Sequence, residues 1–461
     1  MLNRFEETPL RNNLLPLEWQ SQADLDELQQ FLQLNWEQRS AFYDDGGITS
    51  RQQFLSFTGQ RGIRTGRYVG TIVFKGKQLN IFPKMFKTEK DDHETQDLTL
   101  AQLMKNLVQW IDYCTKFDYP YISIKSELDD SNDLRDLFIA LYIRYVKNAL
   151  DRGLFYQYED VTEESGIIKG KFDLQDYVCN KISSGAADKF LCTYSSFELD
   201  NRLNRIIKYT CKLLMNDVSK QNQKLLRHIL IKLNDVADVR SKPSDCDTVR
   251  LSRLHGNYRI ILSMSKMFLL NKTSSYDVNN SDSFCFLFPT SFLFEGFIGG
   301  FMQNVLSDKA RVKLQASEIS LVEDIVIEGQ SHGKAFTMRH DILVEHAEKG
   351  LFILDTKYKE ISRIKGNKDA VLSIRAEANQ PDLYQMFTYA IKRNVRDIYL
   401  LYPMFRLEED ADSAIEMHVD FKMENESYKL RVHIIRLPFI FEDDIEPIKE
   451  RLTATIQEIF K

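Results

Sequence analysis

The segment Arg339–Lys359, RHDILVEHAEKGLFILDTKYK, is typical of two apolar strands joined by a polar turn. Ile342–Val344 supplies the first apolar run and Leu351–Leu354 supplies the second. Ala347–Gly350 lies between them, and its glycine permits the positive φ angle that many tight turns need. The sequence therefore predicts a β-hairpin here, and the C-terminal part of the chain is interpreted outward from it.

Three charged side chains interrupt this apolar hairpin: Asp341, Asp355 and Lys357. Equal counting outward from the middle of the turn places Asp341 opposite Thr356, within one residue of the other two. A one-residue bulge would settle the register and aim all three side chains to one side. Asp355 and Lys357 are two residues apart, so they share one face of a strand.

Two carboxylates on neighbouring strands are suited to hold Mg²⁺ through oxygen ligands, with positions left for water and a phosphate. A lysine beside them can orient the attacking water and offset phosphate charge. The alternative is an ordinary hairpin with charges at its ends, because Asp-x(n)-Asp-x-Lys is a weak pattern by itself. Further features of the chain are needed to decide between the two.

Length and composition limit the class of protein. The chain has 461 residues, which predicts two or three domains, and it is 43% hydrophobic and 28% charged, as globular proteins are. Its net charge is −6, so any nucleic-acid contact must come from local basic patches. The six cysteines form no C-x-x-C pair, which fits a reducing cytoplasm. No apolar signal core or membrane-length apolar run is present, so we expect a cytoplasmic chain with no membrane contact.

Residues 1–97 are predicted to form a β-rich domain that contacts a partner. Strands are expected in FLSFTG, RYVGTIVF and KQLNIFPKM, with Lys75–Lys77 as a turn. The loop 59–67, GQRGIRTGR, has three glycines and three arginines, Arg61, Arg64 and Arg67. It is interpreted either as a solvated hairpin tip or as a flexible finger that contacts a phosphate or a protein.

Residues 98–283 are predicted to be a helical middle region. Apolar stripes at helical spacing recur through it, and 166–173, GIIKGKFD, is expected to form a short β excursion. One helix after Asp200 carries a basic face, and a second basic helix follows it, ending near Lys232. These faces either follow a phosphate backbone or are simply solvated. A polar linker, 271–283, ends the region.

Residues 284–461 are predicted to form a third domain. A helix over 292–306 places Glu295 on an apolar face, which is costly unless the acid is paired or binds a metal. Strands are expected at 311–328, 340–346 and 351–358, and later near 397–402 and in a strand pair around 425–427, before a closing helix. Gly329–Lys334 has too few residues between its glycines for a phosphate-binding loop, so no NTPase motor is predicted.

A helix predicted to start at Gln380 adds Gln385 and Tyr389, which face the same way at i and i+4. The order of Glu295, Asp341, Asp355-Thr-Lys357 and this helix resembles the PD-(D/E)xK nuclease superfamily. The resemblance covers about 120 residues, and His340 stands where that superfamily often has proline. It implies that residues 284–461 form a PD-(D/E)xK nuclease domain, a restriction-endonuclease-like mixed sheet flanked by helices, so the expected fold class is mixed α+β.

More of the chain resembles one family, McrC, the nuclease subunit of McrBC modification-dependent restriction systems. The residues that carry this resemblance are RYVGTIVFKGKQLNIFPKM, GIIKGKFD, SSFELDNRLNRIIK and the nuclease elements above. The resemblance implies a partner, McrB, an AAA+ ring that hydrolyses GTP, recognises methylated DNA and translocates it. The missing nucleotide loop in this chain agrees with that division of labour, although the middle region is longer than in compact family members.

The resemblance also implies roles for single residues. Asp341 and Asp355 would ligate Mg²⁺, Lys357 would position the nucleophilic water, and Glu295 would be an auxiliary metal or water ligand. The reaction would be phosphodiester hydrolysis in double-stranded, methylated DNA, with Mg²⁺ stabilising the developing charge.

Two further sets of residues complete the expected site. Gln385 and Tyr389 would support the metal site or touch DNA. Arg61, Arg64 and Arg67 are predicted to contact the ring, because a chain without its own NTPase motif must sense the motor by contact. The basic helices of the middle region are the alternative contact.

The sequence thus predicts an endonuclease subunit of a restriction system. Two alternatives remain: a stand-alone nuclease of DNA repair with no ring partner, and a non-catalytic adaptor that only activates a ring NTPase.

Overall fold

The computed structural model divides the chain into two compact units. The first contains Met1–Gln33, Thr49–Leu134 and Cys285–Lys461, and the second contains Leu34–Ile48 and Arg135–Phe284. The residues that the structure describes are 2–37, 51–58, 62–86, 100–114, 134–216, 218–252, 255, 257–277, 283–359, 380–404, 415–423, 426–441 and 445–461.

The predicted N-terminal and nuclease regions thus share one unit. A four-stranded sheet, β1-β6-β5-β10, explains this, because its last strand comes from the start of the C-terminal region. Gly70 is required there: it has a φ of +137°, and a Cβ atom on it would lie 2.0 Å from the Phe286 backbone oxygen of β10. The strands are β1 (Leu2–Phe5), β5 (Tyr68–Phe74), β6 (Lys77–Phe82) and β10 (Phe284–Pro289).

Helix α2 (Leu100–Tyr113) also joins the two regions. The Trp110 ring stacks on Phe439 with centroids 4.1 Å apart, and its indole nitrogen donates to the Phe439 backbone oxygen at 2.8 Å. Asn106 donates to and accepts from the Phe441 backbone. These buried contacts link residues more than 300 positions apart, and periodicity along the sequence does not predict them.

The predicted N-terminal elements are largely present. The strands β5 and β6 pair across the expected turn, where Lys75 and Gly76 both have positive φ angles. Ser21 accepts the Asp24 amide at the start of α1. The remaining N-terminal elements are α1 (Gln22–Glu37), β2 (Pro9–Arg11), β3 (Leu55–Phe57) and the short helices η1 (Asn12–Leu14), η2 (Leu17–Trp19) and η5 (Lys84–Phe86).

The prediction of a loop over residues 59–67 is wrong for Gly62–Thr65. These residues form β4, the central strand of the sheet β2-β4-β3. Ile63 and Thr65 are buried and Arg64 between them is exposed, which is the period-2 pattern of a strand. The number of glycines and arginines concealed this pattern. Residues 59–61 lie outside the described part of the chain.

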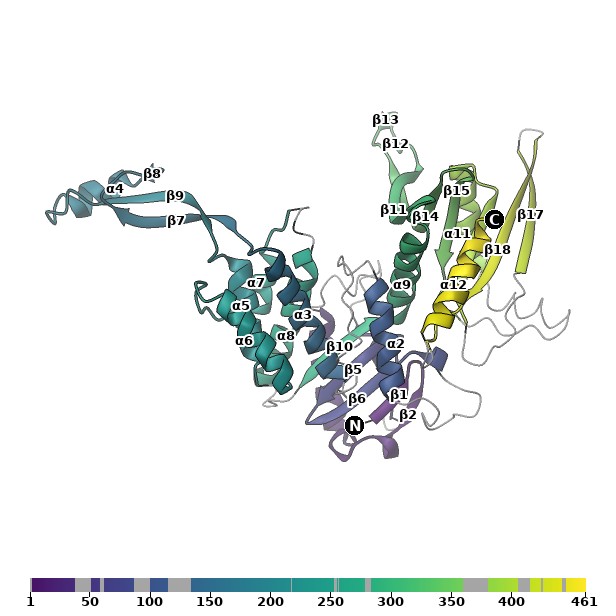
Figure 1. Cartoon of the computed structure of the whole chain (residues 1–461), viewed down its shortest axis with the longest axis horizontal. Helices are drawn as coiled ribbons and strands as arrows, with labels where there is room; N and C mark the ends of the chain where they lie inside the picture. The colour runs from purple at the N-terminus through teal and green to yellow at the C-terminus, as the bar shows by residue number, and fades with distance from the viewer. Residues whose placement is uncertain are drawn as a thin grey trace. The chain divides into compact units, whose positions relative to one another are not determined.

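The C-terminal part of the first unit is a six-stranded mixed sheet of order β11-β14-β15-β16-β18-β17, as expected (Figure 1). Strands β15, β16 and β18 run parallel, and the other neighbours are antiparallel. The strands are β11 (Ala310–Val322), β14 (Ala335–His346), β15 (Gly350–Thr356), β16 (Asp397–Pro403), β17 (Ile415–Met423) and β18 (Glu426–Leu437).

Helices cover both faces of this sheet. Met386 of α11 (Gln380–Arg393) packs with Leu343 and Ile353 on one face. Phe460, at the end of α12 (Glu446–Ile459), packs on Phe352, which points to the other face. Helix α9 (Thr290–Val305) lies on the same face as α12, where Gly299 permits close approach to Leu314 of β11.

The segment Gly329–Lys334 begins in the turn of a small hairpin. Residues 326–331 form a small exposed hairpin, β12 (Val326–Ile327) and β13 (Gln330–Ser331), at the far end of β11 and β14.

The second unit combines a helical bundle with a β ribbon. Strands β7 (Gln157–Ser165) and β9 (Phe190–Glu198) pair over their full nine residues, and β8 (Lys171–Phe172) pairs with β9. We call residues 157–198 the arm; Figure 1 shows its strands running out from the helices. The predicted β excursion is therefore much longer than GIIKGKFD. The helices are α3 (Leu134–Arg152), α4 (Leu174–Asp176), η7 (Tyr177–Lys181), α5 (Arg202–Leu214), α6 (Lys220–Lys232), α7 (Pro243–Asp247) and α8 (Asn257–Asp277).

Candidate active site at the end of β15

The hairpin that carries the predicted site is present, with a register one residue different from the expected one. Ile342 pairs with Leu354 and His346 with Gly350, without interruption. The turn therefore has three residues and is centred on Glu348. Continuing this register brings Asp341 level with Asp355, so no bulge is needed between the two carboxylates.

Asp341 is held by the residue that follows Asp355. Its Oδ2 atom accepts hydrogen bonds from the Thr356 backbone nitrogen at 3.0 Å and from the Thr356 hydroxyl at 2.9 Å. This contact fixes the carboxylate at the end of β15. The predicted neighbour Thr356 is thus found beside Asp341, as a hydrogen-bond partner.

Asp355 is buried, with 1% of its surface exposed. The Lys357 ammonium lies 2.5 Å from its Oδ2 atom, and neither carboxylate oxygen accepts a well-formed hydrogen bond from the described residues. Burial, and then repulsion by Asp341, raise the pKa of Asp355 to about 7, although Lys357 opposes the shift. A buried carboxylate with so few hydrogen-bond donors destabilises the folded chain. Such groups are concentrated at functional sites, which makes Asp355 a candidate functional residue.

Lys357 is fixed at both ends. Its backbone nitrogen donates to the Leu401 oxygen of β16 at 2.8 Å, and its ammonium lies between Asp355 and Asp382 of α11, the latter at 3.8 Å. Burial lowers the pKa of Lys357, but the charge of Asp355 outweighs this, so the net shift is upward. The lysine is therefore a cation throughout the physiological pH range.

Sequence reasoning missed Asp382. Its carboxylate also pairs with Lys359 at 2.5 Å, so it draws both lysines toward α11. The signal was available: Asp382 precedes Gln385 by three residues and Tyr389 by seven, and these spacings place all three on one helix face.

Gln385 and Tyr389 lie on one face of α11, as their spacing predicted, and their side chains contact each other. The Gln385 side chain donates to the Tyr389 hydroxyl at 2.7 Å, and that hydroxyl donates to the Arg339 backbone oxygen at 2.7 Å. The Tyr389 ring lies 4.4 Å from the buried His340 ring. These contacts tie α11 to β14 two residues before Asp341.

A second buried carboxylate, Glu6, contacts the residue after Lys357. Its oxygens accept from the Tyr358 hydroxyl at 2.5 Å, the Thr290 hydroxyl at 2.8 Å and the Lys84 backbone nitrogen at 3.0 Å. Burial raises the pKa of Glu6, while these hydrogen bonds oppose the shift. Glu6 thereby ties β15 and α9 to the N-terminal strands.

The structure brings Asp341, Asp355 and Lys357 together. Glu295 lies half-buried in α9, on the sheet face opposite α11. Among the described residues, no three His, Cys, Asp or Glu side chains form a group that could hold a metal ion. Two carboxylates still fit Mg²⁺, which commonly takes one or two carboxylates and completes its shell with water and phosphate. The role of Glu295 stays a prediction.

The predicted partner-contacting arginines are only partly described. Arg64 is exposed on β4 and donates to the Glu7 backbone oxygen at 3.3 Å. Arg67 pairs with the Glu7 carboxylate at 2.7 Å, and its side chain is 77% exposed. Arg61 lies outside the described residues.

The basic face of α5 is largely neutralised. Arg205 pairs with Asp200, and Lys208 and Lys212 both pair with Asp238. These contacts favour a structural role for the face over a phosphate track. No helix of the described residues is long and apolar enough to span a membrane.

Comparison with known proteins supports a family assignment. The family model described as "McrBC 5-methylcytosine restriction system component" matches residues 63–403. One similar solved structure is the refined half-complex from the tetradecameric assembly of Thermococcus gammatolerans McrB AAA+ hexamers with bound McrC. Its TM-score is 0.59 and its identity 16%, over 99% of each chain.

A cryo-EM structure of the Thermococcus gammatolerans McrBC complex is similar at TM-score 0.43 and 18% identity, over 66% of this chain and 88% of that one. No curated protein matches the chain. The family match spans well over half of the chain and includes the elements that position the carboxylates, and the resemblance to McrC is confirmed. The chain therefore belongs to the McrBC family of 5-methylcytosine restriction system components.

Proposed function

We propose that the chain is the Mg²⁺-dependent endonuclease subunit of a McrBC-like restriction system, with a PD-(D/E)xK active site. The observation that carries this proposal is the convergence of Asp341, Asp355 and Lys357 at the end of β15. Its substrate would be double-stranded, methylated DNA, and its partner a McrB-like AAA+ GTPase ring. Family membership and the similarity to a McrB–McrC assembly support both.

The side chains suggest how the site would work. Asp355 offers two oxygens without well-formed hydrogen bonds from described residues, and Asp341 holds its carboxylate beside them. A bound Mg²⁺ would supply Lewis-acid stabilisation of the phosphate and a more acidic water. Lys357, held between Asp355 and Asp382, can donate a hydrogen bond to the attacking water and balance phosphate charge.

The test is cleavage of methylated and unmethylated DNA by the chain co-purified with its partner ring, with Mg²⁺ and GTP. Asp355→Ala should abolish both cleavage and Mg²⁺ binding measured by calorimetry. Lys357→Ala should lose cleavage and keep Mg²⁺ binding, because it removes no oxygen ligand. Glu348→Ala, an exposed change on the turn of the same hairpin, is the matched control and should keep full activity.

Full cleavage by either site variant would contradict the proposed site. Cleavage by the wild-type chain without a ring would instead favour the stand-alone nuclease. An adaptor predicts no cleavage under any condition, together with normal stimulation of ring GTP hydrolysis by Asp355→Ala.

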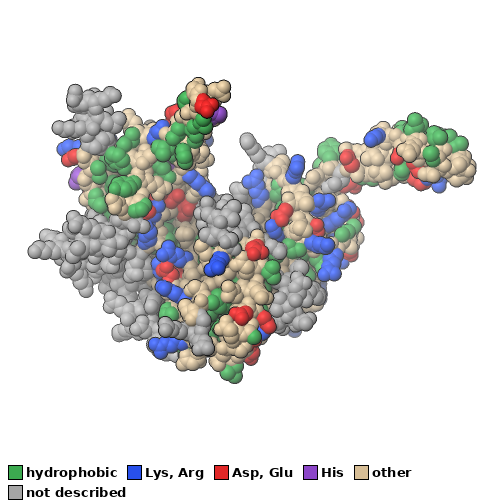
Figure 2. Space-filling model, turned by 180° about the vertical axis from the view of Figure 1, so that it is seen from behind, with side chains coloured by type: hydrophobic (Ala, Val, Ile, Leu, Met, Phe, Trp, Pro, Cys, Tyr) green, Lys and Arg blue, Asp and Glu red, His purple; other side chains and the backbone are tan. Residues whose placement is uncertain are grey.

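For the ring contact, the arm is the candidate that the structure favours. Large apolar side chains on it are exposed, and Figure 2 shows hydrophobic side chains gathered over it. Such exposure is typical of a protein-binding element. The most exposed of these residues are Tyr158, Ile167, Ile168, Leu174, Val178, Ile182 and Phe197.

Arg61, Arg64 and Arg67 remain the competing proposal for the ring contact. Ile167→Asp with Leu174→Asp should abolish stimulation of ring GTP hydrolysis if the arm is the contact. The triple change of Arg61, Arg64 and Arg67 to Ala should do so if the arginines are. Each variant serves as the control for the other, and an unchanged melting temperature checks that each folds.

A further inference from the structure

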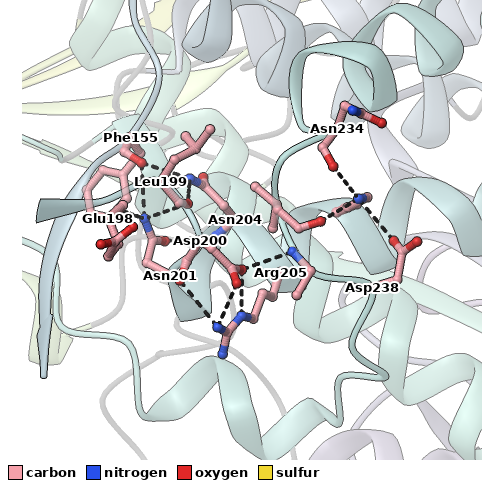
Figure 3. Close-up of polar contacts among 12 residues, drawn as sticks. Phe155, Glu198, Leu199, Asp200, Asn201, Asn204, Arg205, Asn234 and Asp238 are labelled. Carbon is pink, nitrogen blue, oxygen red and sulfur yellow. Dashed lines mark hydrogen bonds and ion pairs between the residues drawn. The ribbon is translucent and has the colours of Figure 1, made fainter. Parts of the chain in front are cut away.

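Two buried asparagines lie where the arm meets the helices, in the stretch SSFELDNRLNRIIK. Asn201 is the N-cap of α5, and Asn204 lies in its first turn; they are 1% and 0% exposed. Buried amides need partners, because each unpaired donor costs about 1–3 kcal/mol. Figure 3 shows where these partners come from.

The amide groups of both asparagines bind the chain on the two sides of the arm. Asn201 donates to the backbone oxygens of Phe155, Glu198 and Leu199 at 3.0–3.1 Å. Asn204 donates to those of Phe155 and Leu199 at 2.7 and 2.8 Å. Phe155 lies two residues before β7 begins, and Glu198 is the last residue of β9. One helix end thus holds the chain both entering and leaving the arm.

These contacts are separate from helix capping. The cap is the Asn201 side-chain oxygen, which accepts the Asn204 backbone nitrogen at 3.1 Å. A cap needs only this acceptor, so the amide donors of Asn201 exceed what the helix requires. The neighbouring Asp200 is itself fixed, because it pairs with Arg205 and accepts the Ala237 backbone nitrogen at 3.0 Å.

The arm has reason to be held at its base. Its nine-residue strands span about 30 Å, so a rotation of about 10° at the base displaces the far end by about 5 Å. Two-stranded ribbons have little core of their own, and the strand residues of the arm are mostly exposed or half-buried. Its direction must therefore be fixed where it joins the bundle.

We propose that Asn201 and Asn204 are positioning residues that fix the direction of the arm relative to the helices of the second unit. The consequence for the ring rests on the proposed function of the arm as the ring contact. A pre-oriented arm binds without first losing orientational freedom, which strengthens binding without any new contact.

The test separates the side-chain amide hydrogen bonds of Asn201 and Asn204 at the base of the arm, here called the clamp, from the N-cap of α5. Asn201→Asp keeps a good N-cap acceptor but removes the donors and places a carboxylate among carbonyl oxygens. Asn204→Ala removes only donors, because its backbone nitrogen still reaches the cap. The control is Ser219→Ala, which weakens the cap of the neighbouring helix α6 without touching the base of the arm.

The readout is the distance distribution between two spin labels on the full chain. One label goes on Cys179, the exposed cysteine of the arm; the other five cysteines are buried. The second goes on Arg227→Cys, at an exposed position of α6. Asn201→Asp and Asn204→Ala should broaden the distribution, and Ser219→Ala should leave it as narrow as in the wild type. If the asparagines only stabilise the fold, all three variants should have a lower melting temperature, and their distance distributions should be equally narrow.

Ring binding is measured on the same proteins. The apparent Kd for the ring should rise about tenfold in both asparagine variants, as a loss of about 1.4 kcal/mol gives. A distribution as narrow as in the wild type for both variants overturns the proposal. A broadened distribution with unchanged ring binding supports the clamp and overturns the arm as the ring contact, so the two failures are distinguishable.

Discussion

Asp355 and Glu6 are both buried carboxylates of the first unit, with 1% and 2% of their surface exposed, yet their surroundings differ. Glu6 accepts three hydrogen bonds, from Tyr358, Thr290 and the Lys84 backbone. Asp355 has Lys357 beside one oxygen and is repelled by Asp341. Burial raises the pKa of both groups.

The difference separates a structural acid from a candidate ligand. Three hydrogen-bond donors surround the Glu6 carboxylate, and these hydrogen bonds connect β15 and α9 to the N-terminal strands. The oxygens of Asp355 lack such donors among the described residues, and a second carboxylate lies next to it, which is favourable only when a cation binds. Burial alone does not distinguish the two acids; the set of hydrogen-bond donors does.

The largest expected effect concerns the pH dependence of stability without metal. The pKa of Asp355 is about 7 in the folded chain against 3.8 in the unfolded one. The folded state therefore binds more protons between these values, and stability falls as pH rises from about 4 to about 7. We expect Asp355 to contribute about 2–4 kcal/mol to this fall.

The measurement is the free energy of unfolding against pH in EDTA, for the wild type and Asp355→Asn. The difference between the two isolates Asp355 from other groups, including Glu6, whose pKa is shifted in the same direction. If the free energy of unfolding changes with pH in the same way for both proteins, Asp355 is ionised over the whole pH range and the charge of Lys357 fully offsets the cost of burying it.

An effect of intermediate size is expected at Glu6. Glu6→Gln leaves one acceptor oxygen where two served three donors, so we expect a loss of about 1–3 kcal/mol in the free energy of unfolding. Glu7→Gln is the control. The Glu7 carboxylate, next to Glu6 in the sequence, is 28% exposed and pairs with Arg67 and Lys84, so this substitution should lower the free energy of unfolding by less than about 1 kcal/mol. Equal losses in chemical denaturation would contradict the structural role of Glu6.

Local patterns in the sequence predicted the hairpin, the shared face of Asp355 and Lys357, and the shared helix face of Gln385 and Tyr389. Each depends on residues a few positions apart, where strand and helix periodicity apply. The mixed sheet followed from the same patterns together with the family resemblance.

Local sequence patterns could not predict the contacts between residues far apart in the chain. The Glu6–Tyr358 hydrogen bond joins residues 352 positions apart, and β10 completes a sheet whose other strands lie before residue 83. Strand β4 was concealed by its glycine and arginine content. The arm was missed because its strands pair with each other and leave large apolar side chains exposed, so they lack the inward-facing stripe of a packed element.

The smallest expected effect is at Tyr389, and it sharpens the distinction between supporting a site and touching substrate. Tyr389→Phe removes the hydroxyl that joins Gln385 to the Arg339 backbone oxygen, which should cost about 1 kcal/mol of stability. Tyr384→Phe is the matched control, because Tyr384 accepts from Gln380 on the same helix but is 62% exposed.

If Tyr389 only holds β14 in place, cleavage should fall by less than about tenfold, with Mg²⁺ binding unchanged, because Asp341 keeps its contact with Thr356. A far larger loss of cleavage at unchanged stability would instead place the hydroxyl against DNA, the other role considered for this residue. Single-turnover cleavage and denaturation, measured on both tyrosine variants, distinguish these outcomes. The buried ring beside His340 and the hydrogen bond to Arg339 favour support of β14.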